Sequence, residues 1–365
     1  MPPTAGEEVA KTIYSGFITE GPKVSEFEKL FGFWLGNPIV ASCNSCTSAI
    51  TLSLATEGVG NGDEVITTPY SCMATNSPIV NLGAKIVWAD IDPSTGNIDP
   101  LSIAEKITSK TKAILYVHWA GQPADISNIL KVAHNHGIPV IEDAAHALGA
   151  QYMGQKIGNH SDYVCFSFQA IKHITTGDGG MVAFNGPKAK ERYERLCRLR
   201  WFGLDRKFNR SVTKWETDIS NVGYKMHMND IVATIGIEQM KHINTVTSAH
   251  ISNALYYDKE FQNLKGVELI RRSNDTVNAA WIYSLMLSSS EKRESFAKHM
   301  IENGIACNVV HVRNDKYSCF KQFKCDLPGV DRFSSRMINI PCGWWLTEKE
   351  ISKIVDTVRQ WSLRE

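Results

Sequence analysis

The 365-residue sequence predicts an α/β fold, in which a large, mostly parallel sheet flanked by helices is followed by a smaller C-terminal α+β domain. Two observations lead to this prediction. In the first two-thirds of the chain, short apolar runs alternate with amphipathic segments, as expected when covering helices join parallel strands. After about Thr247 the pattern changes to helical stretches with one strand-like run. We therefore expect a large domain over residues 1–245, including an N-terminal arm, and a small domain over residues 246–365.

Each element is expected from its apolar spacing. Apolar side chains at helical intervals from Val24 to Leu35 predict a first helix. A second helix is expected over about residues 47–56, and a third begins at the N-cap Asp125 and stops at Gly137. The remaining elements are strands over residues 38–41, 63–67, 84–88, 112–117, 138–141, 163–166 and 283–286, and a final helix around residues 351–363.

The composition excludes several classes of protein. Thirty-nine basic side chains oppose 38 acidic ones, so no global positive field attracts nucleic acid. No apolar run reaches the roughly 18 residues of a membrane span. The N-terminus lacks the basic start and apolar core of a secretory signal, and nine scattered cysteines fit a reduced cytoplasm. Cys43 and Cys46 form a lone CxxC with no second pair, so no metal site is expected.

Three segments that follow expected strands carry candidate chemistry, because ligands of parallel sheets bind beyond the carboxyl ends of the strands. Lys172 precedes a glycine cluster. In a dry pocket its pKa would fall, leaving a neutral amine that can condense with a carbonyl. Asp143 either caps the next helix or faces a protonated pyridine nitrogen. The small residues 44–47 expose backbone N–H groups at a helix N-terminus, which suits an anion.

Together these features require one ligand with a phosphate, an aromatic nitrogen and an aldehyde, and pyridoxal 5′-phosphate (PLP) has all three. The sequence also resembles the DegT/StrS-type nucleotide-sugar aminotransferases. The resemblance extends from residues 16–22 (GFITEGP) to residues 346–350 (LTEKE). Its most specific motifs are EDAAHA at 142–147, SFxxxK at 167–172 and TTGxGG at 175–180. It implies PLP-dependent transferase fold type I, with the cofactor held by the large domain.

The resemblance implies a role for each cofactor-site residue. Lys172 would form the Schiff base with PLP, Asp143 would pair with the pyridine nitrogen, and His146 would contact the ring and its phenolic oxygen. The family usually has glycine at the position of Cys46, but any residue there keeps its backbone donor. The implied phosphate ligands are Ser167, Gln169 and the backbone of Cys46 and Thr47.

Two positions depart from the family pattern. Lys225 stands where relatives place an asparagine that reaches the phosphate of the neighbouring subunit, so either Lys225 serves with a full charge or Asn229 substitutes for it. Cys72 stands where an aromatic ring usually stacks on the cofactor, so either its thiol covers that face or Tyr70 turns in.

Substrate contacts are expected from Thr19, His311 and Arg313. Arg313 lies where relatives place a segment of the substrate cleft, and its guanidinium suits a diphosphate in a bidentate pairing. The alternative for Arg313 is a surface salt bridge.

The sequence thus predicts a PLP-dependent aminotransferase that moves an amino group, by resemblance from glutamate, to the 4-keto position of an NDP-4-keto-6-deoxyhexose. Such sugars serve surface glycans such as the O-antigen of lipopolysaccharide. Residues 174–180 resemble the 4-aminating branch, such as perosamine synthase, and a 3-aminotransferase acting on an NDP-3-keto sugar is the alternative. A PLP-dependent sugar dehydratase would carry histidine in place of Lys172. We also expect a cytoplasmic homodimer with shared active sites and no nucleic-acid or membrane partner.

Overall fold

The computed structural model describes residues 1–205, 218–273 and 275–365, and its largest element is a seven-stranded sheet of order β1-β9-β8-β5-β4-β2-β3. The strands are β1 (Val40–Cys43), β2 (Glu64–Thr67), β3 (Lys85–Trp88), β4 (Thr111–Val117), β5 (Val140–Asp143), β8 (Tyr163–Ser167) and β9 (Gly180–Phe184). Strands β8, β5, β4, β2 and β3 pair in parallel, whereas β9 is antiparallel to both β1 and β8. The expected α/β fold with a mostly parallel sheet is confirmed.

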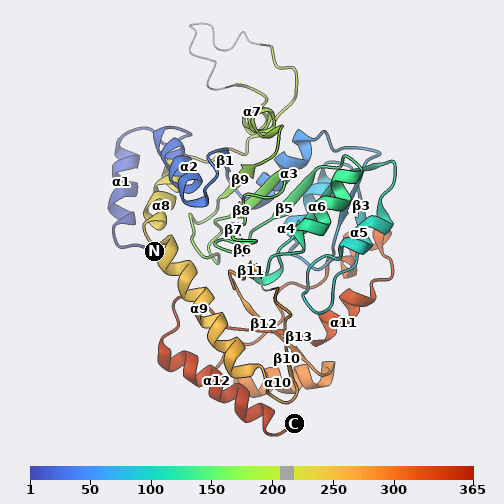
Figure 1. Cartoon of the computed structure of the whole chain (residues 1–365). Coiled ribbons are helices and arrows are strands. Elements are labelled where there is room, and N and C mark those ends of the chain that lie inside the picture. Colours follow the sequence, from blue (N-terminus) through green and yellow to red (C-terminus); the bar gives the residue numbers. More distant parts are fainter. Residues whose placement is uncertain (206–217, 274) are drawn as a thin grey trace.

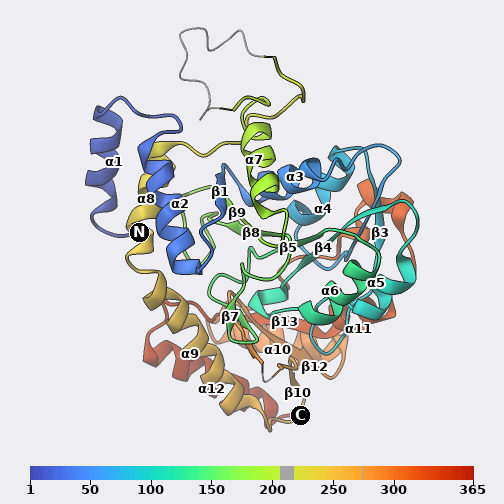
Figure 2. The same cartoon turned by 45° about the horizontal axis from the view of Figure 1, so that its top comes forward.

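Helices cover both faces of this sheet. The helices of this region are α1 (Ala5–Tyr14), α2 (Pro22–Leu35), α3 (Cys46–Thr56), α4 (Met73–Asn81), α5 (Pro100–Lys106), α6 (Ile126–Asn135), α7 (Ala189–Leu199) and α8 (Asp230–Met240), of which α1 packs against α8. Side chains of α3, α4 and α7 pack on one face. On the other face α2 and α8 cover one end of the sheet, and α5 and α6 cover the other. Figures 1 and 2 show α1, α2 and α8 together at one side of the molecule.

The C-terminal region has its own antiparallel sheet of order β10-β12-β13. Its elements are α9 (Ile243–Phe261), β10 (Val267–Leu269), β12 (Tyr283–Leu287), α10 (Ser290–Glu302), α11 (Pro328–Arg336), β13 (Met337–Ile340) and α12 (Glu348–Ser362). A separate core that includes Tyr257, Leu285 and Trp361 fills it. In Figure 1, α9 runs from beside the large sheet to this region. The division at residue 245 stays a prediction, and it would fall within α9.

A third, small sheet joins the two regions, because β11 (Thr276–Val277) of the C-terminal region pairs with β6 (Gln151–Tyr152), which also pairs with β7 (Gln155–Lys156). Short 3₁₀ segments cover Trp119–Gly121, Asn314–Lys316 and Ser318–Phe323. Among the described residues, no helix is long and apolar enough to cross a membrane.

Each helix and strand expected from the sequence has a counterpart in the structure, but other elements were missed, among them the strands β6, β7, β9, β10, β11 and β13. The side chain of Asp125 accepts from the backbone N–H of Asn128, as expected of an N-cap. Strand β5 extends beyond the expected range to Asp143, and β8 extends to Ser167. Strand β9 was not expected, because it follows β8 without an intervening helix and so breaks the alternating pattern on which the prediction rested.

Candidate active site

A cavity of about 300 Å³ opens beyond the carboxyl ends of β1, β5 and β8. This is where parallel sheets bind ligands. Nine of the residues singled out from the sequence line it: Cys46, Thr47, Cys72, Asp143, His146, Ser167, Gln169, Lys172 and His311. They come from segments far apart in the chain, and the fold brings them to one place.

Asp143 is held in the cavity by a chain of hydroxyl groups. Its Oδ2 accepts a 2.6 Å hydrogen bond from Oγ1 of Thr75, which lies 2.6 Å from Oγ of Ser71. Because a carboxylate only accepts, Thr75 must donate to Asp143 and Ser71 must donate to Thr75. The other oxygen, Oδ1, accepts from the backbone N–H of Ala145 at 3.0 Å. The carboxylate is therefore fixed in direction, and it is 3% exposed.

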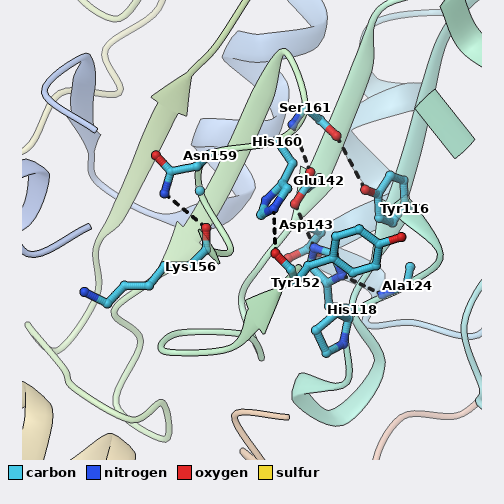
Figure 3. Close-up of polar contacts among 12 residues, drawn as sticks. Tyr116, His118, Ala124, Glu142, Asp143, Tyr152, Lys156, Asn159, His160 and Ser161 are labelled. Atoms are coloured by element: carbon cyan, nitrogen blue, oxygen red, sulfur yellow. Dashed lines mark hydrogen bonds and ion pairs between the residues drawn. The ribbon is translucent and has the colours of Figure 1, made fainter. Parts of the chain in front are cut away.

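The neighbouring residue Glu142 anchors β5 through a fully buried pair with His118 (Figure 3). Nδ1 of His118 accepts from the backbone N–H of Ala124, so its Nε2 carries the proton and donates to Glu142 over 2.8 Å. The backbone N–H of Ser161 donates to the second oxygen of Glu142. Although burial opposes ionisation, the hydrogen bond from His118 lowers the pKa of Glu142. Successive strand residues face opposite sides, so this pair holds β5 from behind the cavity.

Lys172 lies in the loop between β8 and β9, with its amine enclosed. Burial lowers the pKa of this amine to about 8, while the charge of Asp143 acts in the opposite direction. Nζ lies 3.6 Å from the ring centroid of Trp281. At pH 7 about a tenth of such an amine is neutral, far more than of an ordinary lysine with a pKa of 10.5, and the neutral form is the one that acts as a nucleophile or a general base.

Three stacked rings form one wall of the site. The imidazole of His146 stacks on Trp281 with centroids 4.1 Å apart and on His311 with centroids 5.4 Å apart. Burial, followed by the charge of Lys172, lowers the pKa of His146 well below its usual value. Burial likewise lowers the pKa of His311 to about 4. Both imidazoles are therefore neutral near pH 7. The buried Nδ1 of His146 has no hydrogen-bond partner among the described residues.

The N-terminus of α3 forms another side of the cavity. Ser45 caps it by accepting from the backbone N–H of Ser48 at 3.0 Å, and Cys46 and Thr47 in the first turn line the cavity. Strand β9 passes so close that a Cβ on Gly180 would lie 2.4 Å from the carbonyl oxygen of Ser45. Glycine is therefore required at position 180. Because Cys46 and Thr47 line the cavity, the positive end of the α3 dipole faces it and can bind an anion.

Three of the expected site residues do not line the cavity. Lys225 is exposed, with Nζ 5.6 Å from the ring centroid of Trp201. Thr19 is exposed, and its carbonyl accepts from the backbone N–H of Asp230. Arg313 is 6% exposed. Its guanidinium makes two 2.7 Å bonds to one carboxylate, that of Asp315, and also pairs with Asp331. The pair with Asp315 is therefore internal, whereas Asp331 lies at the surface, so the salt-bridge alternative holds in part. The diphosphate contact stays a prediction.

Sequence reasoning missed Thr75, Trp281 and Asn314. Asn314 is buried and joins the segment of His311 to the loop that supports Asp143. Its backbone N–H donates to Pro69 at 2.8 Å and its amide donates to the carbonyl of Ser71 at 2.8 Å. Its side-chain oxygen accepts from Asn76 at 2.9 Å. No local pattern marks these residues. Thr75 and Asn314 had only an indirect signal, since they lie in segments already noted for Cys72 and for Arg313.

The sequence profile of the DegT/DnrJ/EryC1/StrS aminotransferase family matches residues 3–359. The chain belongs to this family. The solved structure of the sugar aminotransferase CalS13 from Micromonospora echinospora is similar, with a TM-score of 0.93 and 36% identity, and the match covers 99% of this chain and 97% of CalS13. The PLP form of Spr1654 from Streptococcus pneumoniae has a TM-score of 0.91 and 28% identity, covering 100% of this chain and 97% of Spr1654. The spore coat polysaccharide biosynthesis protein SpsC of Bacillus subtilis (strain 168) is 33% identical over 364 residues, which is 97% of this chain and 93% of SpsC.

As a member of the DegT/DnrJ/EryC1/StrS family, the chain is a PLP-dependent nucleotide-sugar aminotransferase. The groups that line the cavity of this aminotransferase also fit PLP, independently of the similarity to relatives. The cavity offers an amine of lowered pKa, an oriented carboxylate, an imidazole nitrogen that is buried and has no partner within the described ranges, and a helix N-terminus. These are the groups that an aldehyde, a pyridine nitrogen, a phenolic oxygen and a phosphate require.

Proposed function

We propose that this enzyme transfers an amino group from glutamate to the 4-keto position of an NDP-4-keto-6-deoxyhexose used in surface-glycan synthesis. The observation that carries the transfer chemistry is the enclosed amine of Lys172, whose pKa burial lowers to about 8. Glycan synthesis is supported by the similarity to SpsC, which is described as a spore coat polysaccharide biosynthesis protein. The 4-position is supported by residues 174–180, which resemble the 4-aminating branch.

Each residue of the cavity has its own role in cofactor binding or proton transfer. When bound, PLP supplies the electron sink for the amino-acid substrate. Lys172 holds the cofactor at rest, and its released amine then moves a proton as general base and general acid. Asp143, fixed by Thr75, keeps a proton on the pyridine nitrogen. The neutral His146, whose Nδ1 has no hydrogen-bond partner among the described residues, would contact the phenolic oxygen. The phosphate is bound by Ser167, Gln169 and the backbone of Cys46 and Thr47.

The residues outside the cavity suit other roles. Lys225 is exposed and suits the phosphate of a neighbouring subunit, in a homodimer with shared sites. Arg313 orients the segment that carries His311, and Thr19 lies in the segment before α2 that resembles the substrate region of relatives. A cytoplasmic location follows from the need for nucleotide sugar and glutamate. The large domain that holds the cofactor spans residues 1–245.

Two experiments test this proposal. Borohydride reduction of the holoenzyme, followed by peptide mapping, should place the cofactor on Lys172. Incubation with glutamate and either a 4-keto or a 3-keto nucleotide sugar, followed by NMR of the product, should place the new amine at C4. Amination at C3 alone would refute the regiochemistry and favour the 3-aminotransferase, while leaving the aminotransferase activity intact. Dehydration without amination would refute the transfer function.

A further inference from the structure

Trp281 makes two contacts with the lysine segment that the proposed mechanism does not use. Its ring centroid lies 3.6 Å from Nζ of Lys172. Its indole N–H donates a 2.8 Å hydrogen bond to the carbonyl of Ile171, the residue before the lysine. Trp281 is 6% exposed and lies just before β12 in the C-terminal region. One side chain from the C-terminal region therefore contacts both the backbone of the lysine loop and the amine of Lys172.

Trp281 is itself held in place. Its ring stacks on His146 with an interplanar angle of 18°. The backbone ahead of it is also fixed, because ring nitrogens of His173 and His250 bond the carbonyls of the two preceding residues at 3.0 and 2.9 Å. The indole face is therefore a rigid surface, and its direction does not depend on Lys172.

An aromatic face attracts an ammonium group through the quadrupole of the ring, and more strongly where water is excluded. We propose that the indole face of Trp281 is the surface that holds the amine of Lys172 whenever this amine is not bonded to the cofactor. The inference rests on the proposed role of Lys172. Between the two halves of transamination the lysine would otherwise swing on its flexible stem. Trp281 keeps the amine inside the cavity, close to His146 and the reacting atoms.

Other groups also act on this amine, and the test must separate them from Trp281. The titratable side chains that influence Lys172 or are influenced by it are Asp143, Cys46, Cys72, His146, His173 and His311. They come from β5 and the segment after it, from α3, from the loop before α4, from the lysine loop and from the segment before Asn314. All six stay in the chain when Trp281 is replaced by an apolar residue, but His146 loses the ring on which it stacks. Trp281→Phe keeps a ring at this position, so it serves as the comparison for that loss.

The pKa of the Lys172 amine in the cofactor-free, full-length chain reports on this contact directly. Trace labelling with acetic anhydride between pH 6 and 10, followed by mass spectrometry of the peptide that contains Lys172, gives this pKa without any activity measurement. Trp281→Leu keeps an apolar wall but removes the ring, so the pKa should fall by about 0.5–1. Trp281→Phe keeps a ring and loses the indole N–H, so the pKa should stay close to the wild-type value.

A matched control is a second Lys–Trp pair far from the cavity, in which Nζ of Lys156 lies 4.6 Å from the ring centroid of Trp34. Trp34→Leu should leave the pKa of Lys172 unchanged. If Trp281→Leu fails to fold, Trp281→Met provides a flexible apolar replacement. An unchanged or raised pKa in the ring-free variant would overturn the inference. An equal fall in the phenylalanine variant would do the same, because it would assign the effect to the hydrogen bond with Ile171.

The borohydride experiment keeps the two proposals apart. Trapping of the cofactor on a different lysine would refute the role of Lys172 whatever the labelling shows. Trapping on Lys172 with no effect of the Trp281 variants on the pKa would refute only the holding role of Trp281.

Discussion

Replacing Lys172 with methionine should stabilise the cofactor-free protein by an amount that depends on pH. Burial lowers the pKa of Lys172 from 10.5 to about 8. At 1.36 kcal/mol per pKa unit, burying the charged amine at pH 7 therefore costs about 3 kcal/mol of folding free energy. A methionine side chain has a similar shape and no charge. The free energy of unfolding of Lys172→Met at pH 7 should therefore exceed that of the wild type by up to about 3 kcal/mol.

The pH dependence carries the sharper test. Below pH 8 the amine is protonated in both folded and unfolded chains, so the penalty is complete. Between pH 8 and 10.5 only the unfolded chain holds the proton, so wild-type stability rises with pH relative to the variant. Urea unfolding at pH 7, 8, 9 and 10 should show this difference shrinking, whereas the exposed Lys349→Met should show none. A constant difference between Lys172→Met and wild type over this range would refute the enclosed-amine account.

Three further outcomes are expected. Thr75→Val removes the hydrogen bond to Asp143, so PLP should bind roughly 10-fold more weakly in an absorbance titration; an equal dissociation constant would contradict the positioning role. Lys172→Ala should abolish transamination, and turnover above roughly 5% of wild type would contradict the assignment. Arg313→Leu leaves Asp315 buried without its bidentate partner and should cost about 3 kcal/mol of unfolding free energy with little change in KM. A raised KM with unchanged stability would instead make Arg313 a substrate clamp.

The cofactor end of the site was predictable because its residues lie in short segments. Each of Asp143, Ser167 and Lys172 follows an apolar run, and an apolar run that is buried on both faces is recognisable without a structure. The rule that ligands bind beyond strand ends then placed these residues together. The missed strand β9 did not disturb this outcome, since it lies after the lysine loop.

The support of the site was not predictable. Trp281 and Asn314 act through a few contacts with segments distant in sequence, and such contacts leave no periodic pattern. The surroundings of Arg313 could not be foreseen for a related reason. A sequence shows a guanidinium at a suitable position, but only the fold shows that Asp315 and Asp331 accept hydrogen bonds from it.

The origin of Trp281 in the C-terminal region has a consequence for synthesis of the chain. Ribosomes deliver the protein from its N-terminus at about 5–20 residues per second, and domains tend to fold as they emerge. Lys172 and Asp143 leave the ribosome well before Trp281, His311 and Asn314 do. Until the last third of the chain arrives, the nascent protein lacks one wall of the cavity. The lowered pKa of Lys172 requires that enclosure. The lysine therefore becomes more reactive toward aldehydes in the cell only after the C-terminal region has folded onto the large sheet.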